Sequence, residues 1–231
     1  MRRWWVVLAA CLTVAVVVPA AWWATRPSDS EGVAVSAVGT TAGPSVSTRP
    51  AAPAATPPAG RSVPKITARP ATPEAGDADR VLPVSMTIPA IDVTAAVDAV
   101  GVESDGSMVI PRSVDRVGWY RYGSVPGSES GAAVLAGHVD SKGQGPGALF
   151  RLRELGVGDR VDVRLDDGSK VVYEVVGKET LVKKRLPTET LFARDGAPRL
   201  VLVTCGGPFI RELSSYRDNL VVVAEPVGGV G

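Results

Sequence analysis

Side chains that carry most enzyme chemistry are scarce in this sequence. Among 231 residues there are 2 cysteines and 1 histidine. Cys11 lies inside an apolar N-terminal run, so the rest of the chain has one thiol, Cys205, and one imidazole, His138. A single thiol cannot form an intrachain disulfide, and an unpaired cysteine in an exported protein indicates a reactive thiol. Cysteine counting alone leaves a buried, inert thiol equally open, because free cysteine is often fully buried.

An excess of basic residues is also absent from the C-terminal part of the chain. From Val81 onward there are 17 lysines and arginines against 19 aspartates and glutamates, a net charge of −2. Nucleic acid binding requires a basic patch or stripe. We therefore expect no nucleic acid partner.

Charged residues are missing from a long stretch near the N-terminus. Arg2 and Arg3 precede an uncharged, mainly apolar run from Trp4 to Ala24, which is long enough to cross a bilayer as a helix. Tryptophan pairs lie at both ends of the run, as interfacial anchors do, and the two arginines favour the cytoplasmic side. We therefore predict a cytoplasmic stub and a membrane-spanning anchor over residues 1–24, with the C-terminal part of the chain extracellular.

Two other interpretations of this segment stay open. A cleavable signal peptide has a shorter apolar core, but Val18-Pro19-Ala20 resembles a weak cleavage site. The residues Leu8-Ala9-Ala10-Cys11 resemble a lipoprotein box, although little apolar sequence precedes Cys11 and the run continues well past it. The anchor remains the prediction, with Cys11 as a small apolar residue that faces lipid.

Large apolar residues are nearly absent between residues 25 and 80, where Pro, Ala, Ser, Thr and Gly dominate. Such a segment cannot bury enough apolar surface to offset the entropy lost on ordering, and its prolines favour an extended chain. We predict a disordered linker without a fold over residues 25–80 and one domain over residues 81–231.

Short strand-like runs separated by turn signals recur through the predicted domain. Asp166-Asp167-Gly168, between two alternating runs, is a strong hairpin signal, and helical patterning is limited to residues 149–155 and 188–193. Many short strands with glycine-rich turns favour a mainly β fold, either a closed antiparallel barrel or a sandwich. We expect strands at residues 84–88, 95–102, 132–137, 160–165, 170–183, 199–205 and 219–224.

Three polar side chains lie at the ends of predicted strands. Cys205 closes an apolar run and precedes two glycines that would leave room for a substrate backbone, His138 follows another run, and Arg217 opens the next one. A thiol is a poor nucleophile at neutral pH unless a base or a cation acts on it. Taken singly, a histidine is more often structural and an arginine more often solvated. If the last two strands pair antiparallel, Cys205 and Arg217 should lie side by side.

The joint pattern resembles that of the sortases, the cysteine transpeptidases of Gram-positive cell surfaces. The order and spacing of three motifs agree with that family. The stretch from His138 to Ser141 and the residues that follow it are most like class F, the group common in actinobacteria. These following residues are Gly145-Pro146-Gly147-Ala148-Leu149-Phe150-Arg151-Leu152. The motifs are Ala136-Gly137-His138-Val139-Asp140, similar to the histidine motif, Leu202-Val203-Thr204-Cys205, similar to the Leu-X-Thr-Cys motif, and Tyr216-Arg217-Asp218-Asn219, similar to the arginine segment.

This resemblance implies a closed eight-stranded sortase-type β-barrel with short helices and a two-step reaction. Cys205 would attack the carbonyl between Thr and Gly of a Leu-Pro-X-Thr-Gly-like sorting signal and form a thioester, which an amine of peptidoglycan would resolve. His138 would protonate the leaving amine and deprotonate the incoming one. Arg217 would donate hydrogen bonds to the substrate and the developing oxyanion. Thr204 would help orient the substrate, or would only pack as a β-branched residue in its strand.

The resemblance also implies partners and the absence of cofactors. The partners would be secreted proteins that carry the sorting signal, the peptidoglycan precursor amine, and the membrane. Pilus-building sortases usually carry an Asp-Pro-aromatic lid motif and a C-terminal membrane span, and we find neither, which favours protein anchoring. Some relatives bind calcium through clustered acidic residues, but Glu179, Glu189 and Asp195 are scattered, so we expect no metal or other cofactor.

Two other kinds of exported protein remain as alternatives. One is a different cysteine peptidase. An L,D-transpeptidase would carry histidine two positions before the cysteine, where Val203 stands, and a papain-like peptidase would place the cysteine before the histidine. The other alternative is a non-catalytic module that binds the cell wall, which would not need Cys205, His138 and Arg217 together.

Overall fold

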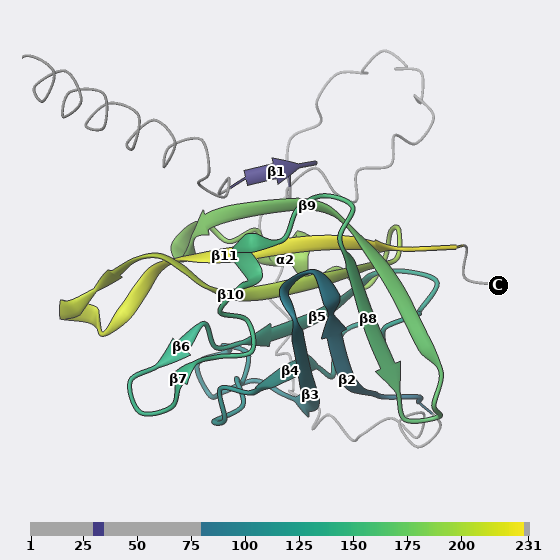
Figure 1. Cartoon of the computed structure of the whole chain (residues 1–231), viewed down its shortest axis with the longest axis horizontal. Helices are drawn as coiled ribbons and strands as arrows, with labels where there is room; N and C mark the ends of the chain where they lie inside the picture. The colour runs from purple at the N-terminus through teal and green to yellow at the C-terminus, as the bar shows by residue number, and fades with distance from the viewer. Residues whose placement is uncertain (1–29, 35–79, 229–231) are drawn as a thin grey trace, which may run out of the picture.

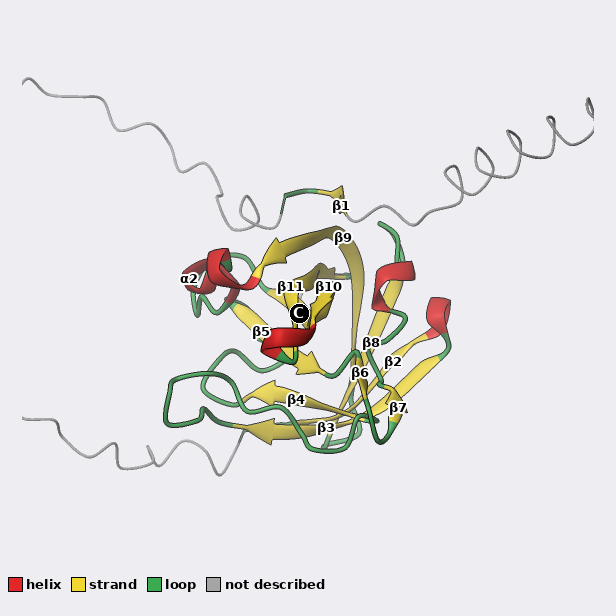
Figure 2. Cartoon of the chain, turned by 90° about the vertical axis from the view of Figure 1, so that its left-hand side faces the viewer, coloured by secondary structure: helices red, strands yellow, loops and turns green. Residues whose placement is uncertain are grey.

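Eight strands close into a β-barrel (Figure 1, Figure 2). The computed structural model describes residues 30–34 and 80–228. The barrel strands are β2 (Pro83–Ile88), β3 (Val93–Val100), β4 (Arg116–Tyr120), β5 (Ala132–Gly137), β8 (Arg160–Leu165), β9 (Lys170–Val182), β10 (Arg199–Ile210) and β11 (Ser215–Pro226). Their order around the barrel is β9-β11-β10-β5-β4-β3-β2-β8, and β8 pairs with β9 to close the ring. The expected eight-stranded barrel is therefore confirmed.

Apolar residues on one face of each strand fill the barrel. In β8, Val161, Val163 and Leu165 are buried, whereas the two arginines of this strand are exposed. This two-residue period is that of a strand with one face toward a core. The same buried cluster includes Trp119 of β4 and Leu200 of β10.

By contrast, β5 and β10 bury residues on both faces. All residues of β5 are buried. Ala132, Val134 and Val201 belong to a second cluster, which also contains Leu191 of the short helix α2 (Thr188–Leu191). Because both faces are covered, β5 and the first half of β10 read as continuous apolar runs rather than alternating ones.

Two pairs of neighbouring strands run parallel, so the expectation of a wholly antiparallel barrel is wrong. β3 pairs with β4, and β5 pairs with β10, in parallel. Parallel neighbours cannot be joined by a tight turn, and the chain between β5 and β10 forms β8 and β9 before it returns. Turn signals report only local hairpins, so they could not reveal these long-range pairings.

Most strand positions agree with the sequence prediction. β5 and β8 have the predicted bounds, and β2, β3 and β9 differ by one or two residues. The predicted hairpin joins β8 to β9, and Gly168 has a φ of +86°, which glycine adopts without strain. No pattern predicts β4, because its three central residues are all buried and do not alternate.

The helical segments are short. Residues 149–155 contain only the 3₁₀ turn η3 (Leu152–Glu154), and residues 188–193 contain α2. The described residues also contain the 3₁₀ turns η2 (Pro89–Ile91), η4 (Lys183–Arg185) and η5 (Arg211–Leu213). In the part of the chain that the structure describes, no helix has the length and apolar character needed to span a bilayer. The predicted anchor over residues 1–24 lies outside that part.

One short strand lies within the segment predicted to have no fold. β1 (Ser30–Gly32) pairs antiparallel with Gly177, Lys178 and Glu179 of β9. Main-chain hydrogen bonds to an exposed sheet edge supply this pairing, so side-chain composition could not predict it. Residues 25–29 and 35–79 lie outside the described residues, and the domain boundary at residue 81 stays a prediction.

The buried hydroxyl of Tyr173 predicts an alkaline limit to stability. Burial raises the pKa of Tyr173 to about 12, although the hydroxyl accepts a 2.8 Å hydrogen bond from the Gly127 backbone nitrogen. Because the folded-state pKa lies above the unfolded value of about 10, this contribution is present below about pH 10 and is lost as the pH rises through about 12. We expect the free energy of unfolding to fall by about 2–3 kcal/mol over that range.

The variant Tyr173→Phe should reduce this alkaline decline. At neutral pH it should lose about 1 kcal/mol, because the Gly127 N–H is left without its acceptor. Denaturant unfolding of both proteins across the alkaline range measures the two effects. Tyr122→Phe, which changes an exposed tyrosine, is the matched control. If the free energy of unfolding of Tyr173→Phe falls with pH as steeply as that of the unchanged protein, Tyr173 does not cause the alkaline decline.

Candidate active site

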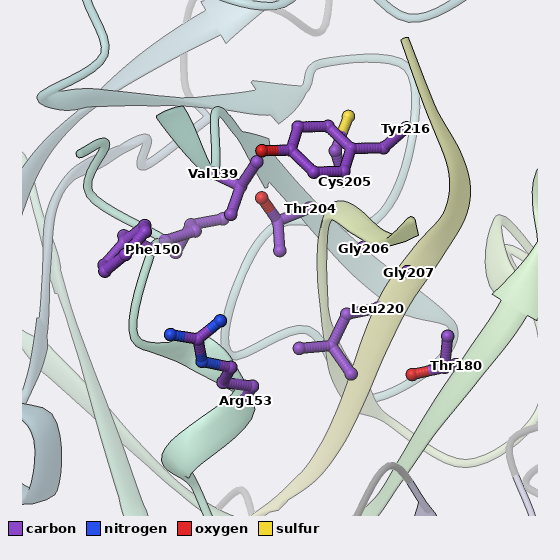
Figure 3. A pocket seen from close by; sticks show the side chains of 11 residues that line it. Val139, Phe150, Arg153, Thr180, Thr204, Cys205, Gly206, Gly207, Tyr216 and Leu220 are labelled. Carbon is purple, nitrogen blue, oxygen red and sulfur yellow. The ribbon is translucent and has the colours of Figure 1, made fainter. Parts of the chain in front are cut away.

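A cavity of about 290 Å³ lies beside Cys205 (Figure 3). Of the predicted site residues, Cys205 and Thr204 line it, whereas His138 and Arg217 do not. However, Val139, which follows His138, and Tyr216, which precedes Arg217, do line the cavity. The lining residues are Val139, Leu149, Phe150, Arg153, Thr180, Thr204, Cys205, Gly206, Gly207, Tyr216 and Leu220.

The sequence predicts Cys205 at the end of a strand. In the structure, Cys205 lies within β10 instead. The strand continues to Ile210, and its pairing with β11 is irregular between Gly206 and Phe209. In this bulge, Gly207 and Pro208 of β10 face the single residue Arg217 of β11, and the bulge lies between Cys205 and the tip of the hairpin. The thiol is free and half-buried, and it borders the cavity.

Thr204 links the cysteine strand to the histidine segment. Its hydroxyl donates a 2.9 Å hydrogen bond to the carbonyl oxygen of Gly137, and the side chain is buried. Gly137 is the last residue of β5 and directly precedes His138. The hydroxyl therefore does more than pack in the strand. Its predicted role in orienting a substrate stays a prediction.

His138 follows β5, as expected, and is half-buried. Its Nε2 lies 3.0 Å from the carbonyl oxygen of Pro111. A carbonyl oxygen only accepts hydrogen bonds, so Nε2 must carry a proton in this arrangement. Among residues 30–34 and 80–228, Nδ1 has no hydrogen-bond partner and is the nitrogen that remains available to a substrate.

A glycine holds the segment after His138 in place. The Gly147 nitrogen donates a 2.8 Å hydrogen bond to the carbonyl oxygen of Val139. A Cβ atom on Gly147 would lie 2.3 Å from the carbonyl oxygen of His138. A side chain at this position would therefore push the histidine segment away. Just before it, β6 (Asp140–Ser141) pairs with β7 (Gly145–Pro146) and closes the loop.

The expected antiparallel pairing of β10 with β11 is present, and Arg217 lies diagonally across from Cys205 rather than directly opposite it. Cys205 pairs with Asn219, and Arg217 lies two residues before Asn219 in β11, which places it on the same face of the strand as Asn219. The side chain is more than half exposed. Its Nε and Nη2 donate hydrogen bonds to Oδ1 and Oδ2 of Asp218, both at 2.8 Å.

Asp218 is the buried partner of this arginine. The hydrogen bonds and charge of Arg217 hold the pKa of Asp218 below its usual value, and the carboxylate raises the pKa of Arg217. Gly207 has a φ of +68°, and a Cβ atom on it would lie 2.1 Å from Oδ2 of Asp218. The glycine after Gly206 thus accommodates this carboxylate, rather than leaving room only for a substrate.

Tyr216 joins the two halves of the site. Its hydroxyl donates a 2.6 Å hydrogen bond to Oδ2 of Asp140, two residues after His138. This hydrogen bond, with burial, raises the pKa of Tyr216 to about 12. Tyr216 and Cys205 line the same cavity (Figure 3). Sequence reasoning assigned no role to Tyr216, Asp140 or Asp218, although each lies within a recognised motif.

Metal-binding side chains do not gather anywhere in the described part of the chain. No group of three or more His, Cys, Asp or Glu residues within it could hold a metal ion.

The fold and a family comparison define the class of this protein. A family model described as a sortase domain matches residues 86–227, more than half of the chain, and this range contains every predicted site residue. The protein is a cysteine transpeptidase. It belongs to the sortase family.

Several solved sortase structures match part of this chain. Sortase C-1 from Actinomyces oris is 23% identical, with 62% of this chain and 73% of that chain covered and a TM-score of 0.49. Sortase C1 of Streptococcus agalactiae in complex with MTSET is 24% identical over 64% and 68%, with a TM-score of 0.49. Sortase A from Corynebacterium diphtheriae is 20% identical over 64% and 61%, with a TM-score of 0.48. A search of curated proteins returns no match.

The hydrogen bond between Tyr216 and Asp140 predicts energetic coupling across the site. Tyr216→Phe should destabilise the protein by about 1 kcal/mol, because a hydrogen bond to a charged acceptor is lost at a half-exposed position. Asp140→Ala should remove the same interaction, so the double variant should lose less than the sum of the single variants. Denaturant unfolding of the four proteins measures this coupling. Strictly additive losses would show that the two side chains do not interact in solution.

Proposed function

We propose that this sortase is anchored in the cell membrane and cleaves a Leu-Pro-X-Thr-Gly-like sorting signal between Thr and Gly. It then joins the released protein to an amine of the cell wall. Family membership supports the transpeptidase chemistry. The observation that carries the proposal is the free thiol of Cys205 beside a cavity, since it is the one thiol within the described residues.

The first step forms a thioester at Cys205. Its Sγ attacks the threonine carbonyl carbon, the tetrahedral oxyanion collapses, and the carbon–nitrogen bond to glycine breaks. The glycine amine leaves with a proton. An acceptor amine then loses a proton, attacks the thioester carbon, and releases the Cys205 thiolate. Splitting the transfer into two displacements at one carbonyl is the advantage of covalent catalysis.

His138 moves the proton in both steps. It gives a proton to the leaving amine and takes one from the incoming amine, as a general acid and then a general base. Nδ1 is the suitable nitrogen, because Nε2 is engaged with the carbonyl oxygen of Pro111. That hydrogen bond also fixes the tautomer of the ring and its orientation.

Arg217 stabilises the oxyanion and binds the substrate. A guanidinium carries five N–H donors, of which Asp218 engages one on Nε and one on Nη2. The remaining three can face a substrate. Asp218 therefore fixes the plane of the arginine fork and leaves these three donors free of Asp218. Thr204 acts with them by keeping the cysteine strand in register with the histidine segment and by orienting the substrate.

The proposed class, the membrane anchor and the identity of the partners rest on the sequence. The motif around His138 and residues 145–152 is most similar to class F. The apolar run between Trp4 and Ala24 with Arg2 and Arg3 before it supports a single-pass anchor, with the catalytic domain extracellular. The partners are then secreted proteins that carry the sorting signal and a peptidoglycan precursor that supplies the amine.

Replacing the thiol tests the reaction. Cys205→Ala should abolish both cleavage and transfer of a Leu-Pro-X-Thr-Gly peptide, because the thioester cannot form. In the unchanged protein, an acyl-enzyme should be trapped on Cys205 and released by hydroxylamine, as peptide mapping by mass spectrometry would show. Cys11→Ala, which removes the other cysteine of the chain, is the matched control and should stay active. Transfer by Cys205→Ala would rule out the proposed mechanism.

Replacing the guanidinium tests the oxyanion assignment. Arg217→Lys keeps the charge but loses the planar fork that serves Asp218 and the substrate together. We expect kcat to fall by about 100- to 1000-fold, with a smaller change in KM. Steady-state kinetics and thermal unfolding of the same variant separate catalysis from stability. A stable variant with nearly normal kcat would remove Arg217 from the mechanism.

A further inference from the structure

Arg153 is the one charged residue among those that line the cavity beside Cys205, within the part of the chain described. The remaining lining residues are apolar or neutral. The guanidinium extends into the space between Phe150 and Leu220 (Figure 3). Its carbon Cζ lies 5.2 Å from the centroid of the Phe150 ring, within the range of a cation–π contact. A permanent cation therefore borders the same cavity as the thiol.

Local structure holds Arg153 at this position. It lies in the 3₁₀ turn η3 between Leu152 and Leu155, which are both fully buried in the barrel. Nζ of Lys178 donates hydrogen bonds to the carbonyl oxygens of Arg153 and Leu155, at 2.9 and 2.5 Å. Two apolar anchors and a buried ammonium group thus fix the backbone of the turn. The Arg153 side chain starts from a rigid base.

No carboxylate of the described residues pairs with Arg153. The neighbouring Glu154 pairs with Arg151, with 2.7 Å between Nη2 and Oε2. Asp140 accepts the Tyr216 hydroxyl and does not line the cavity. Arg153 is exposed, and its charge makes a small contribution to the lowered pKa of Glu154, which the hydrogen bond from Arg151 mainly causes. Within the described residues, no carboxylate forms an ion pair with the Arg153 guanidinium, so it is available to an anion that enters the cavity.

We infer that Arg153 binds a carboxylate of a substrate that reacts at Cys205. This rests on the proposed function, since a peptide or an amine acceptor must occupy the cavity. The planar fork of arginine matches a carboxylate through two parallel hydrogen bonds. Leu149 and Leu220 in the same cavity contact the carbon chain that carries the carboxylate. Arg153 is thus a specificity residue that does not touch the reacting carbonyl.

The carboxylate has two possible sources in the reaction. It belongs either to the sorting signal or to the acceptor amine. The same full-length protein can distinguish the two with substrates that differ only in charge. The donor arm compares Leu-Pro-Glu-Thr-Gly with Leu-Pro-Gln-Thr-Gly, both amidated at the C-terminus. The acceptor arm compares diglycine with diglycine amide, using the neutral donor.

We expect the charged substrate to be preferred in one of the two arms. The preference should be about threefold to tenfold, in kcat/KM for the donor or in the ratio of transfer to hydrolysis for the acceptor, as for a partly exposed charge-assisted pair. Arg153→Gln should bring the ratio close to one. Raising the salt concentration should weaken the preference in the unchanged protein. The arm in which the charged substrate is preferred identifies the source of the carboxylate.

The control variant removes a different positive charge from the same region. Lys142 is exposed, follows β6 and does not line the cavity. Lys142→Gln should keep the preference, so a general effect of net charge is separated from binding by Arg153. The inference is overturned if neither arm shows a preference in the unchanged protein, or if Arg153→Gln retains the preference.

A binding measurement separates failure of this inference from failure of the proposed function. In an NMR titration, the Arg153 Nε–H signal should shift and saturate on addition of diglycine or of the Leu-Pro-Glu-Thr-Gly peptide, and not of diglycine amide or the Leu-Pro-Gln-Thr-Gly peptide. This readout does not depend on turnover. A saturable shift without any peptide cleavage would overturn the proposed function and retain the carboxylate site. Cleavage without a shift and without a charge preference would overturn the site and retain the function.

Discussion

The parallel pairing of β10 with β5 is the constraint on which the rest of the site depends. Five residue pairs, from Arg199 opposite Ala132 to Val203 opposite Ala136, hold the two strands in one register. The hydrogen bond between Thr204 and Gly137 continues this register by one step. Because Cys205 and His138 directly follow these residues, the register fixes where they lie relative to each other. β5 ends before His138, whereas Cys205 stays paired with Asn219 of β11. A slip by one residue would turn the thiol to the other face of the strand.

Carboxylates organise the polar groups around this pairing. Asp218 orients Arg217, and Asp140 binds Tyr216, so adjacent residues of β11 are held by acids from two different segments. The glycine at position 207 is needed because Asp218 occupies the space that a Cβ atom would fill. Arg153 has no carboxylate partner of this kind among the described residues. In this it differs from Arg151, just before η3, which pairs with Glu154.

Sequence reasoning located most strands and the candidate residues, and it failed where distant segments meet. β8 was predictable because its side chains alternate, and its hairpin because glycine is required at position 168. β4 was not predictable, since all its central residues are buried. The register of β10 against β11 pairs Cys205 with Asn219 and leaves Arg217 diagonally across from the cysteine, and a bulge follows between Gly206 and Phe209. A bulge depends on the partner strand, so inspection of one segment does not reveal it.

The sequence by itself determined which side chains are available for chemistry, because one thiol and one imidazole outside the N-terminal run leave few combinations. It also determined the mainly β class, because strand periodicity is local. Only the tertiary structure decided which strands run parallel, that Asp218 holds Arg217, and that Arg153 borders the cavity of Cys205. These contacts join residues far apart in the chain, and their geometry follows from barrel closure, which no local pattern encodes.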